Sequence, residues 1–217
     1  MTHASLDSNS HIVHAPGGFL AAGSWDGIAD LADLTKTQTV RVSAHSTLEF
    51  SDVTDADSFA VLAAQLGFYT GPERVIVPPL LPRNAEAAVA ECAWSLLPGS
   101  ELVEIQVGGQ PHLGVADART HILGGQPDSR QVEVKDVIGW ISRDDGTVSL
   151  GAALEDGVIS SYLARLLGVI GTPSAITPFG TVLIHNLSEV IADQVLRVLP
   201  GMGMIFDADS VNQLYSR

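Results

Sequence analysis

Histidine, arginine and cysteine are the residue types in this chain that could do chemistry, and they are few. The 217 residues include seven histidines, eleven lysines and arginines together, and one cysteine, Cys92. A lone thiol excludes an internal disulfide, and it excludes a metal or iron–sulfur site built from several thiolates of this chain. Cys92 falls on the apolar side of a predicted helix beside Val89 and Leu96. We therefore expect a buried structural thiol rather than a reactive one.

The histidines offer weak signals for a metal site. His45 lies in a polar turn between two predicted strands, where an imidazole could bind a metal, act as a pH-sensitive cation, or have no role beyond being an exposed turn residue. His112 and His121 flank Asp117, but two histidines and one carboxylate in a loop do not predict zinc without further ligands. We predict no metal site.

The charge balance limits the partners. The 25 acidic residues outnumber the 11 lysines and arginines and give a net charge of −14, which disfavours nucleic acid and anionic membrane surfaces. The polar N-terminus has no basic segment followed by an apolar run, and no stretch of about 18 apolar residues occurs. We therefore expect a cytoplasmic protein with no membrane segment.

Helical and strand periodicities alternate in the first third of the chain. A short extended run from His11 reaches a Pro-Gly-Gly turn, and apolar residues recur at helical spacing from Trp25 to about Thr37. Strands at 39–44 and 48–53 follow, and then a helix from about Asp55 to Leu66, which Gly67 ends.

The last third repeats this order. The pattern predicts a strand at 148–152, a helix at 156–167, strands at 174–177 and 181–187, and a helix at 190–199. Residue matches support the repeat, among them Leu20 with Leu150 and Ala22 with Ala152. Two copies of a βαββα unit imply a pseudo-two-fold arrangement, because each sheet needs a partner for its uncovered face.

The middle segment fits neither copy. A buried strand at 74–80, an alanine-rich helix at 85–97 with Asn84 as its N-cap, a strand at 102–107 and more strand within 131–141 indicate a shortened α+β module. The predicted class is α+β, with two pseudo-symmetric ferredoxin-like half-domains around this module. The predicted boundaries are a tail at 1–10, half-domains at 11–72 and 147–209, the middle module at 73–146, and a tail at 210–217.

The turns of the two copies resemble the nitrite and sulfite reductase superfamily, and most closely its precorrin-3B synthase branch from cobalamin synthesis. Pro16-Gly17-Gly18-Phe19-Leu20 stands where that branch has Pro-Gly-Gly-Arg-Leu. The segment 42–49 stands where it has Leu-Thr-Ser-Arg-Ala-Asn-Leu-Gln, and Ala175-Ile176-Thr177-Pro178-Phe179-Gly180 where it has Arg-Leu-Thr-Pro-Trp-Arg. The resemblance covers about 11–208 in the right order.

The resemblance implies a tetrapyrrole ligand held through its carboxylates by arginines, a four-iron cluster bound by cysteines and, in the reductases, sirohaem. At the positions of those arginines this chain has Phe19, His45, Ala175 and Gly180. We therefore expect the chain alone to bind no cluster and no other cofactor, and unaided catalysis by it is disfavoured.

Two functional hypotheses follow from the resemblance. The first is a non-catalytic binding or assembly relative in tetrapyrrole metabolism, and the second is one subunit of a split enzyme whose cluster-bearing half is a separate chain. The partners implied are a tetrapyrrole, a cluster-bearing protein, or a second copy bound through an exposed strand edge. The candidate ligand-binding residues are Arg41, His45, Arg74, Arg83, Arg119, Thr177 and His185. Surface charge, or pairing with neighbouring acids, is the alternative for each arginine.

Overall fold

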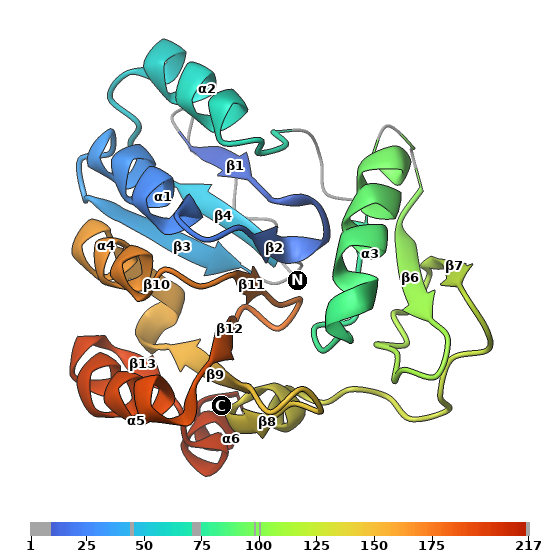
Figure 1. Ribbon diagram of the computed structural model, residues 1–217. Coiled ribbons are helices and arrows are strands. Elements are labelled where there is room, and N and C mark those ends of the chain that lie inside the picture. Colours follow the sequence, from blue (N-terminus) through green and yellow to red (C-terminus); the bar gives the residue numbers. More distant parts are fainter. Residues whose placement is uncertain (1–9, 44–45, 71–74, 98, 100, 216–217) are drawn as a thin grey trace.

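The computed structural model describes residues 10–43, 46–70, 75–97, 99 and 101–215, and it confirms the α+β class (Figure 1). The first part of the chain forms short strands and two helices: β1 (His11–Val13), η1 (Pro16–Gly18), β2 (Phe19–Leu20), α1 (Ser24–Asp33), β3 (Thr39–Ser43), β4 (Thr47–Phe50) and α2 (Ala56–Gln65). Asp55 begins α2, because its carboxylate accepts a hydrogen bond from the backbone N–H of Ser58 at 3.0 Å.

The last part of the chain forms the second half-domain: β9 (Val148–Leu154), η4 (Glu155–Gly157), β10 (Val158–Ser160), α4 (Ser161–Ile170), β11 (Ser174–Ile176), β12 (Val182–Leu187), α5 (Glu189–Val198), η5 (Leu199–Met202), β13 (Met204–Ile205) and α6 (Ala208–Tyr215). Serine side chains cap both of its longer helices. Ser160 accepts from the N–H of Leu163 at 3.1 Å, and Ser188 accepts from that of Ile191 at 3.4 Å.

The two half-domains exchange strands. One sheet has the order β1-β4-β3-β10, and the other runs β13-β9-β12-β11-β2. Strand β10 of the second copy therefore pairs with β3 of the first, while β2 of the first copy pairs with β11 of the second. Each half-domain is completed by a strand of the other, which makes the pair one folding unit.

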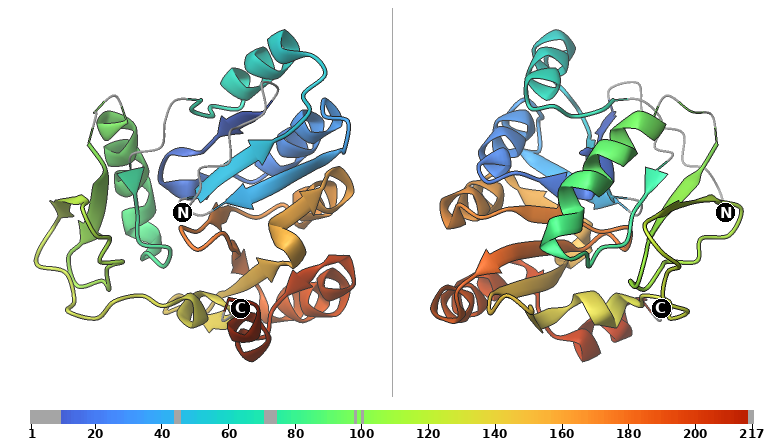
Figure 2. Two further views of the ribbon diagram at one scale, coloured as in Figure 1. Left: turned by 180° about the vertical axis from the view of Figure 1, so that it is seen from behind. Right: turned by 45° about the vertical axis from the view of Figure 1, so that its right-hand side comes forward.

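A row of four helices covers one side of these sheets. Figure 1 and the turned views of Figure 2 show α2, α1, α4 and α5 side by side, and α1 packs against α4. Trp25 of α1 is 1% exposed in the core between the helices and the sheets, and its indole Nε1 donates to Ser174 Oγ of β11 at 2.8 Å. The contact joins the first copy to the second through a buried hydrogen bond.

The middle module, with α3 facing the half-domains, stands on another side of the molecule (Figure 1). It contains β5 (Val75–Ile76), α3 (Arg83–Leu96), β6 (Val103–Val107) and β7 (Arg119–Leu123), whose strands pair in parallel in the order β5-β6-β7. Glu104 of β6 is 2% exposed, and its carboxylate accepts from the N–H groups of Leu113, Gly114 and Val115 at 2.7–3.0 Å. These bonds satisfy the buried charge and fix the loop that carries Leu113.

The chain returns to the second half-domain through η3 (Val134–Val137) and β8 (Gly139–Ser142). Strand β8 pairs with β9 and so extends the sheet of the second half-domain. The strand predicted within 131–141 is therefore short, and the segment before it is a 3₁₀ turn with a capping box between Glu133 and Asp136.

Several local predictions are wrong. The helix expected from Asp156 begins at Ser161, because Asp156 adopts a left-handed conformation (φ 54°) in a tight turn and β10 follows it. Asn84 is not the N-cap of α3, since that position belongs to Pro82. The C-terminal residues expected as a tail instead form α6 up to Tyr215, and Val211 is 1% exposed against Ile138 and Ala153.

Candidate functional site

Two of the turns on which the resemblance to the tetrapyrrole enzymes rests are 16–20 and 175–180. Their backbones lie in close contact. Gly18, at φ 72°, lies so close to the second copy that a Cβ there would be 2.2 Å from the carbonyl oxygen of Ile176. In the turn after Ile176, the hydroxyls of Thr177 and Thr181 hydrogen-bond at 2.7 Å, and both residues are fully buried. Thr177 is therefore a structural residue of its turn, and its hydroxyl is already engaged.

Apolar side chains fill the space beside these turns. Ala175 is 3% exposed, and Phe19 and Phe179 are half-buried in the same cluster. The middle module and the connection that follows it supply the other side of the cluster, which includes Leu80, Leu113, Val132, Val137 and Ile141. Two of the positions where the resembling enzymes place arginines are thus packed against the chain's own apolar residues.

A histidine is buried next to this cluster. His185 of β12 is 4% exposed, and its Nδ1 lies 3.0 Å from the hydroxyl of Ser149, which is fully buried on the neighbouring strand β9. No described residue offers a hydrogen-bond partner to its Nε2. Burial, assisted by the positive charge of Arg143, lowers the pKa of His185 to about 4, so the ring is neutral at physiological pH.

An ion pair connects the turn between β8 and β9 to α3. Arg143, in the turn between β8 and β9, places its guanidinium 3.8 Å from the carboxylate of Glu86 and donates to the carbonyl oxygen of Leu81. Arg83, one turn earlier on α3, lies 3.9 Å from Asp145. Burial raises the pKa of Glu86, although the two arginines oppose the shift. The pairs fasten the tip of the β8–β9 hairpin to the N-terminal end of α3.

Two hollows flank the Arg143–Glu86 pair. One, of about 250 Å³, is lined by residues 80–83, Gln110 and 141–145. The other, of about 320 Å³, is lined by residues 19–21, Glu86, Ala87, Ala90, 173–174 and His185. Since Arg143 lines the first and Glu86 the second, the ion pair stands between them. This polar site at the N-terminal half of α3 is the candidate functional site.

The structure brings only some of the predicted residues to this site. Arg83 and His185 are there. Arg41 is exposed and donates to the carbonyl oxygen of Asp156 at 2.9 Å, and Arg119 pairs with Glu101 at 3.2 Å on the outer strand β7. His45 and Arg74 lie outside the described residues.

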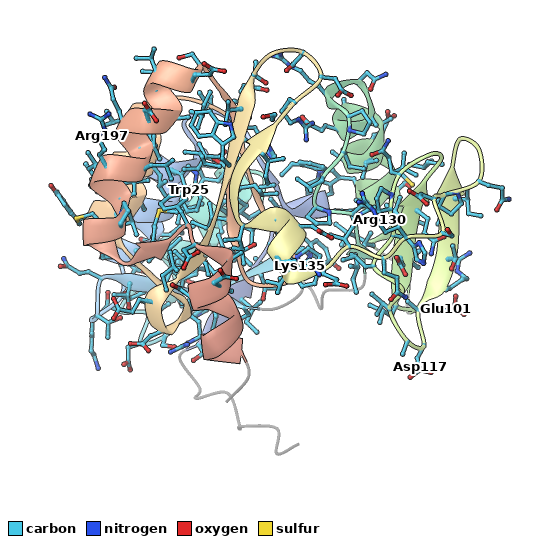
Figure 3. The ribbon with its side chains drawn as sticks, turned by 90° about the horizontal axis from the view of Figure 1, so that it is seen from below. Trp25, Glu101, Asp117, Arg130, Lys135 and Arg197 are labelled. Carbon is cyan, nitrogen blue, oxygen red and sulfur yellow. The ribbon has the colours of Figure 1, made fainter. Side chains whose placement is uncertain are left out.

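The remaining cations do not gather at the site. Figure 3 shows Arg197 on α5, on the side of the molecule opposite Glu101 and Asp117, while Arg130 and Lys135 lie between these extremes. Lys135 is paired with Glu133 at 2.6 Å, and Arg165 with Asp30 and Asp33 at 3.0 and 2.6 Å. Most described cations are therefore engaged by neighbouring acids.

Sequence reasoning missed Arg143, Glu86, Ser149 and Ser174. Arg143 begins an Arg-Asp-Asp-Gly run that is typical of a solvated hairpin turn, and Glu86 falls in an alanine-rich helix among other polar residues. The serines are isolated in apolar strands. No signal in the sequence marks these residues, because the site depends on how the β8–β9 hairpin meets α3.

The residues present do not fit a four-iron cluster. Cys92 is the chain's only thiol and lies half-buried on α3, where burial raises its pKa and so disfavours the thiolate. Among the described residues, no three histidine, cysteine or acidic side chains come together as a metal site, and this includes His112, His121 and Asp117. Phe19, Ala175 and Gly180 likewise offer no side-chain donor to the carboxylates of a sirohaem.

The architecture belongs to the class built from ferredoxin-like half-domains. Among solved structures, the NirA protein of Mycobacterium tuberculosis is similar, with a TM-score of 0.68 and 13% sequence identity. The match covers 91% of this chain and 57% of NirA, so the chain spans little more than half the length of that protein. No family model matches the chain, and no curated protein matches it. At this identity the similarity shows the fold alone.

The described helices include none that is both long and apolar enough to cross a bilayer.

Proposed function

We propose that this chain is a non-catalytic, precorrin-3B synthase-like protein that acts as a binding or assembly protein in cobalamin or other tetrapyrrole metabolism. The observation that carries the proposal is the apolar packing of Phe19, Ala175 and Phe179 against the middle module. Two of these positions correspond to arginines in the resembling enzymes, whose guanidinium groups would have to face a ligand. In this chain the side chains at those two positions, Phe19 and Ala175, pack in an apolar cluster and so stabilise the fold rather than face a ligand.

The single cysteine supports the same proposal. A catalytic member would need several thiolates to hold its cluster, and this chain supplies one, with its pKa raised by burial. Retention of the fold without the arginines or the thiolates favours a role in holding a ligand or a partner. Among the candidate cations that the structure describes, Arg83 is the one both exposed and placed at the polar site, since its side chain is 66% exposed.

A titration with a polycarboxylate tetrapyrrole such as uroporphyrin tests this role. We expect saturable quenching of the exposed Trp94 and Trp140, with a dissociation constant on the order of 1 μM. Arg83→Gln should weaken binding about tenfold, because it removes one charge-assisted contact. Arg197→Gln is the matched control, since the Arg197 side chain is also mostly exposed and lies on the distant helix α5.

Absence of saturable binding would contradict the binding role, and equal effects of the two arginine variants would contradict the location. Oxygen-dependent turnover of a precorrin by the isolated chain would contradict the non-catalytic character.

A second function is favoured by the length of the match. Because the chain aligns with only 57% of NirA, it could be one subunit of a split precorrin-3B synthase or nitrite/sulfite reductase-type oxidoreductase. The cysteines and the arginines would then come from another chain. Isolation of a stable complex that contains this chain, iron, sulfide and a cysteine-bearing partner would support this function over the first.

A further inference from the structure

Strand β7 is the outer strand of the middle module, and one of its two edges is unpaired in the described part of the chain. The sheet order β5-β6-β7 ends at it, and Figure 1 shows it near the right-hand margin of the molecule. Its register with β6 runs from Arg119 to Leu123 without a bulge. An edge of this kind leaves backbone N–H and C=O groups available to a further strand.

The hydrogen bonds to β6 show which backbone groups of β7 are free. The N–H of Arg119 donates to the carbonyl oxygen of Leu102 at 2.8 Å, and the carbonyl oxygen of Leu123 accepts at 2.9 Å from the N–H that follows β6. In a parallel ladder, alternate residues bond to the same neighbouring strand. Every second residue from Arg119 therefore faces β6, and Thr120 and Ile122 direct their N–H and C=O groups outward.

Strand β7 lacks most of the features that protect a strand edge from pairing. Proteins blunt such edges with very short strands, prolines, charged side chains or bulges. The strands at the ends of the other two sheets, β1, β10, β13 and β2, have two or three residues each, whereas β7 has five. It contains no proline, lysine or acid, and its one permanent charge, Arg119, lies at the first residue and pairs with Glu101. The side chain of Ile122 adds an exposed apolar surface.

We propose that the β7 strands of two copies of this chain pair antiparallel about a two-fold axis at His121, which joins the two middle modules into one six-stranded sheet. With His121 opposite its counterpart, Thr120 lies opposite Ile122 of the second copy, and the symmetry repeats this pair. Each pair exchanges two hydrogen bonds, so all four outward groups of each β7 are satisfied. Registers centred at Thr120 or Ile122 would instead use residue 118 or 124, which lie outside β7. The dimer does not depend on tetrapyrrole binding.

The mass of the full chain in solution tests the dimer. By light scattering, we expect the mass to rise from one chain to two with concentration, with a dissociation constant on the order of 100 μM, because the contact is small. Added salt should strengthen the dimer, since it screens the repulsion between two copies of net charge −14. A mass of one chain up to about 1 mM would overturn the proposal.

Thr120→Pro tests the edge itself. The change removes an outward N–H and no hydrogen bond to β6, so it should abolish the dimer. Thr120→Val is the matched control, because it keeps the N–H and the branched side chain, and it should dimerise as the wild type does. A dimer that persists in Thr120→Pro would show that β7 does not form the contact.

Ile122→Lys is a second variant, in case the proline disturbs the fold. A lysine on the edge should weaken the dimer at least about tenfold. Val169→Lys, at a residue 83% exposed on α4, should leave the dimer unchanged. If Val169→Lys dissociates the dimer and Ile122→Lys does not, the copies meet through their helices and the proposal is wrong.

Cross-linking in a Cys92→Ala background tests the register. Opposite residues of a non-hydrogen-bonded pair have Cα atoms about 4.5 Å apart, within the roughly 4.4–6.8 Å that disulfides span. His121→Cys should therefore give a disulfide-linked dimer on air oxidation, whereas Thr120→Cys should not, because it faces Ile122. Cross-linking through residue 120 that equals or exceeds that through residue 121 would overturn the register.

Discussion

Gly18→Ala is expected to destabilise the chain by at least about 3 kcal/mol, because two independent costs add at this residue. The backbone has φ 72°, which L side chains rarely adopt, and the new Cβ would lie 2.2 Å from the carbonyl oxygen of Ile176. That carbonyl belongs to the backbone of the second copy, so it can move only if the two turns separate. The free energy of unfolding, measured by urea denaturation, reads out the effect.

Gly67→Ala is the matched control for the conformational cost alone. Gly67 follows α2 with φ 74°, and no atom of the described residues lies within 4 Å of the position of a Cβ. Replacing Gly67 by alanine should lower the free energy of unfolding by about 1 kcal/mol. Equal losses in the two variants would show that the contact between the turns contributes nothing, and would contradict the tight junction of the half-domains.

Acidification from pH 6.5 to pH 4 is expected to remove several kcal/mol of stability. Burial lowers the pKa of both His14 and His185 from 6.5 to about 4. In this window the unfolded chain takes up protons that the native chain does not, so unfolding becomes more favourable as the pH falls. Each histidine contributes up to about 3 kcal/mol, a large part of the roughly 5–15 kcal/mol that stabilises a typical domain.

The other groups with shifted pKa values either change the stability outside the window from pH 6.5 to 4 or oppose the loss of stability within it. The lowered pKa values of Asp55, Asp145 and Asp207 mean that their contribution is lost below about 3.8. Burial raises the pKa of Glu86, so this group favours the native chain at the acid end and opposes the trend. The loss expected between pH 6.5 and 4 therefore belongs to the two histidines.

His14→Phe isolates one of these contributions. Neither ring nitrogen of His14 has a hydrogen-bond partner in the described part of the chain, and the ring packs edge-on against Tyr69 at 5.0 Å between centroids. Phenylalanine keeps the aromatic contact and removes the protonation site, so the fall in stability between pH 6.5 and 4 should shrink by about half. If the urea midpoint of the variant depends on pH as it does in the wild type, His14 does not contribute to the loss of stability between pH 6.5 and 4.

The order of elements could be predicted from the sequence because local signals determine it. Apolar residues at helical spacing from Trp25 led to α1, the pattern from about Asp55 to Leu66 led to α2, and the pattern of the last third led to α4 and α5. The exchange of β2 and β10 between half-domains could not be predicted. These strands span two and three residues, and such short runs carry no information about which strand they pair with.

The candidate site was predictable only in part. His185 and Arg83 were candidates, whereas Arg143 and Glu86 were not, because their sequence context is that of a solvated turn and a polar helix face. The site depends on contacts between α3 and the β8–β9 hairpin, which are separated by more than forty residues, as in the bond from Arg143 to Leu81. Tertiary packing also buries Phe19 and Phe179 next to the turns that the resemblance assigns to a ligand.

The proposed function requires this chain to hold the fold without the cluster chemistry of the enzymes it resembles. Iron and acid-labile sulfide, measured per chain after anaerobic reconstitution with both, test it most directly. We predict a colourless protein with substoichiometric iron and sulfide, since Cys92 is the chain's only thiol. A brown protein with about four iron and four sulfide per chain, as a [4Fe–4S] cluster requires, would contradict the proposed function.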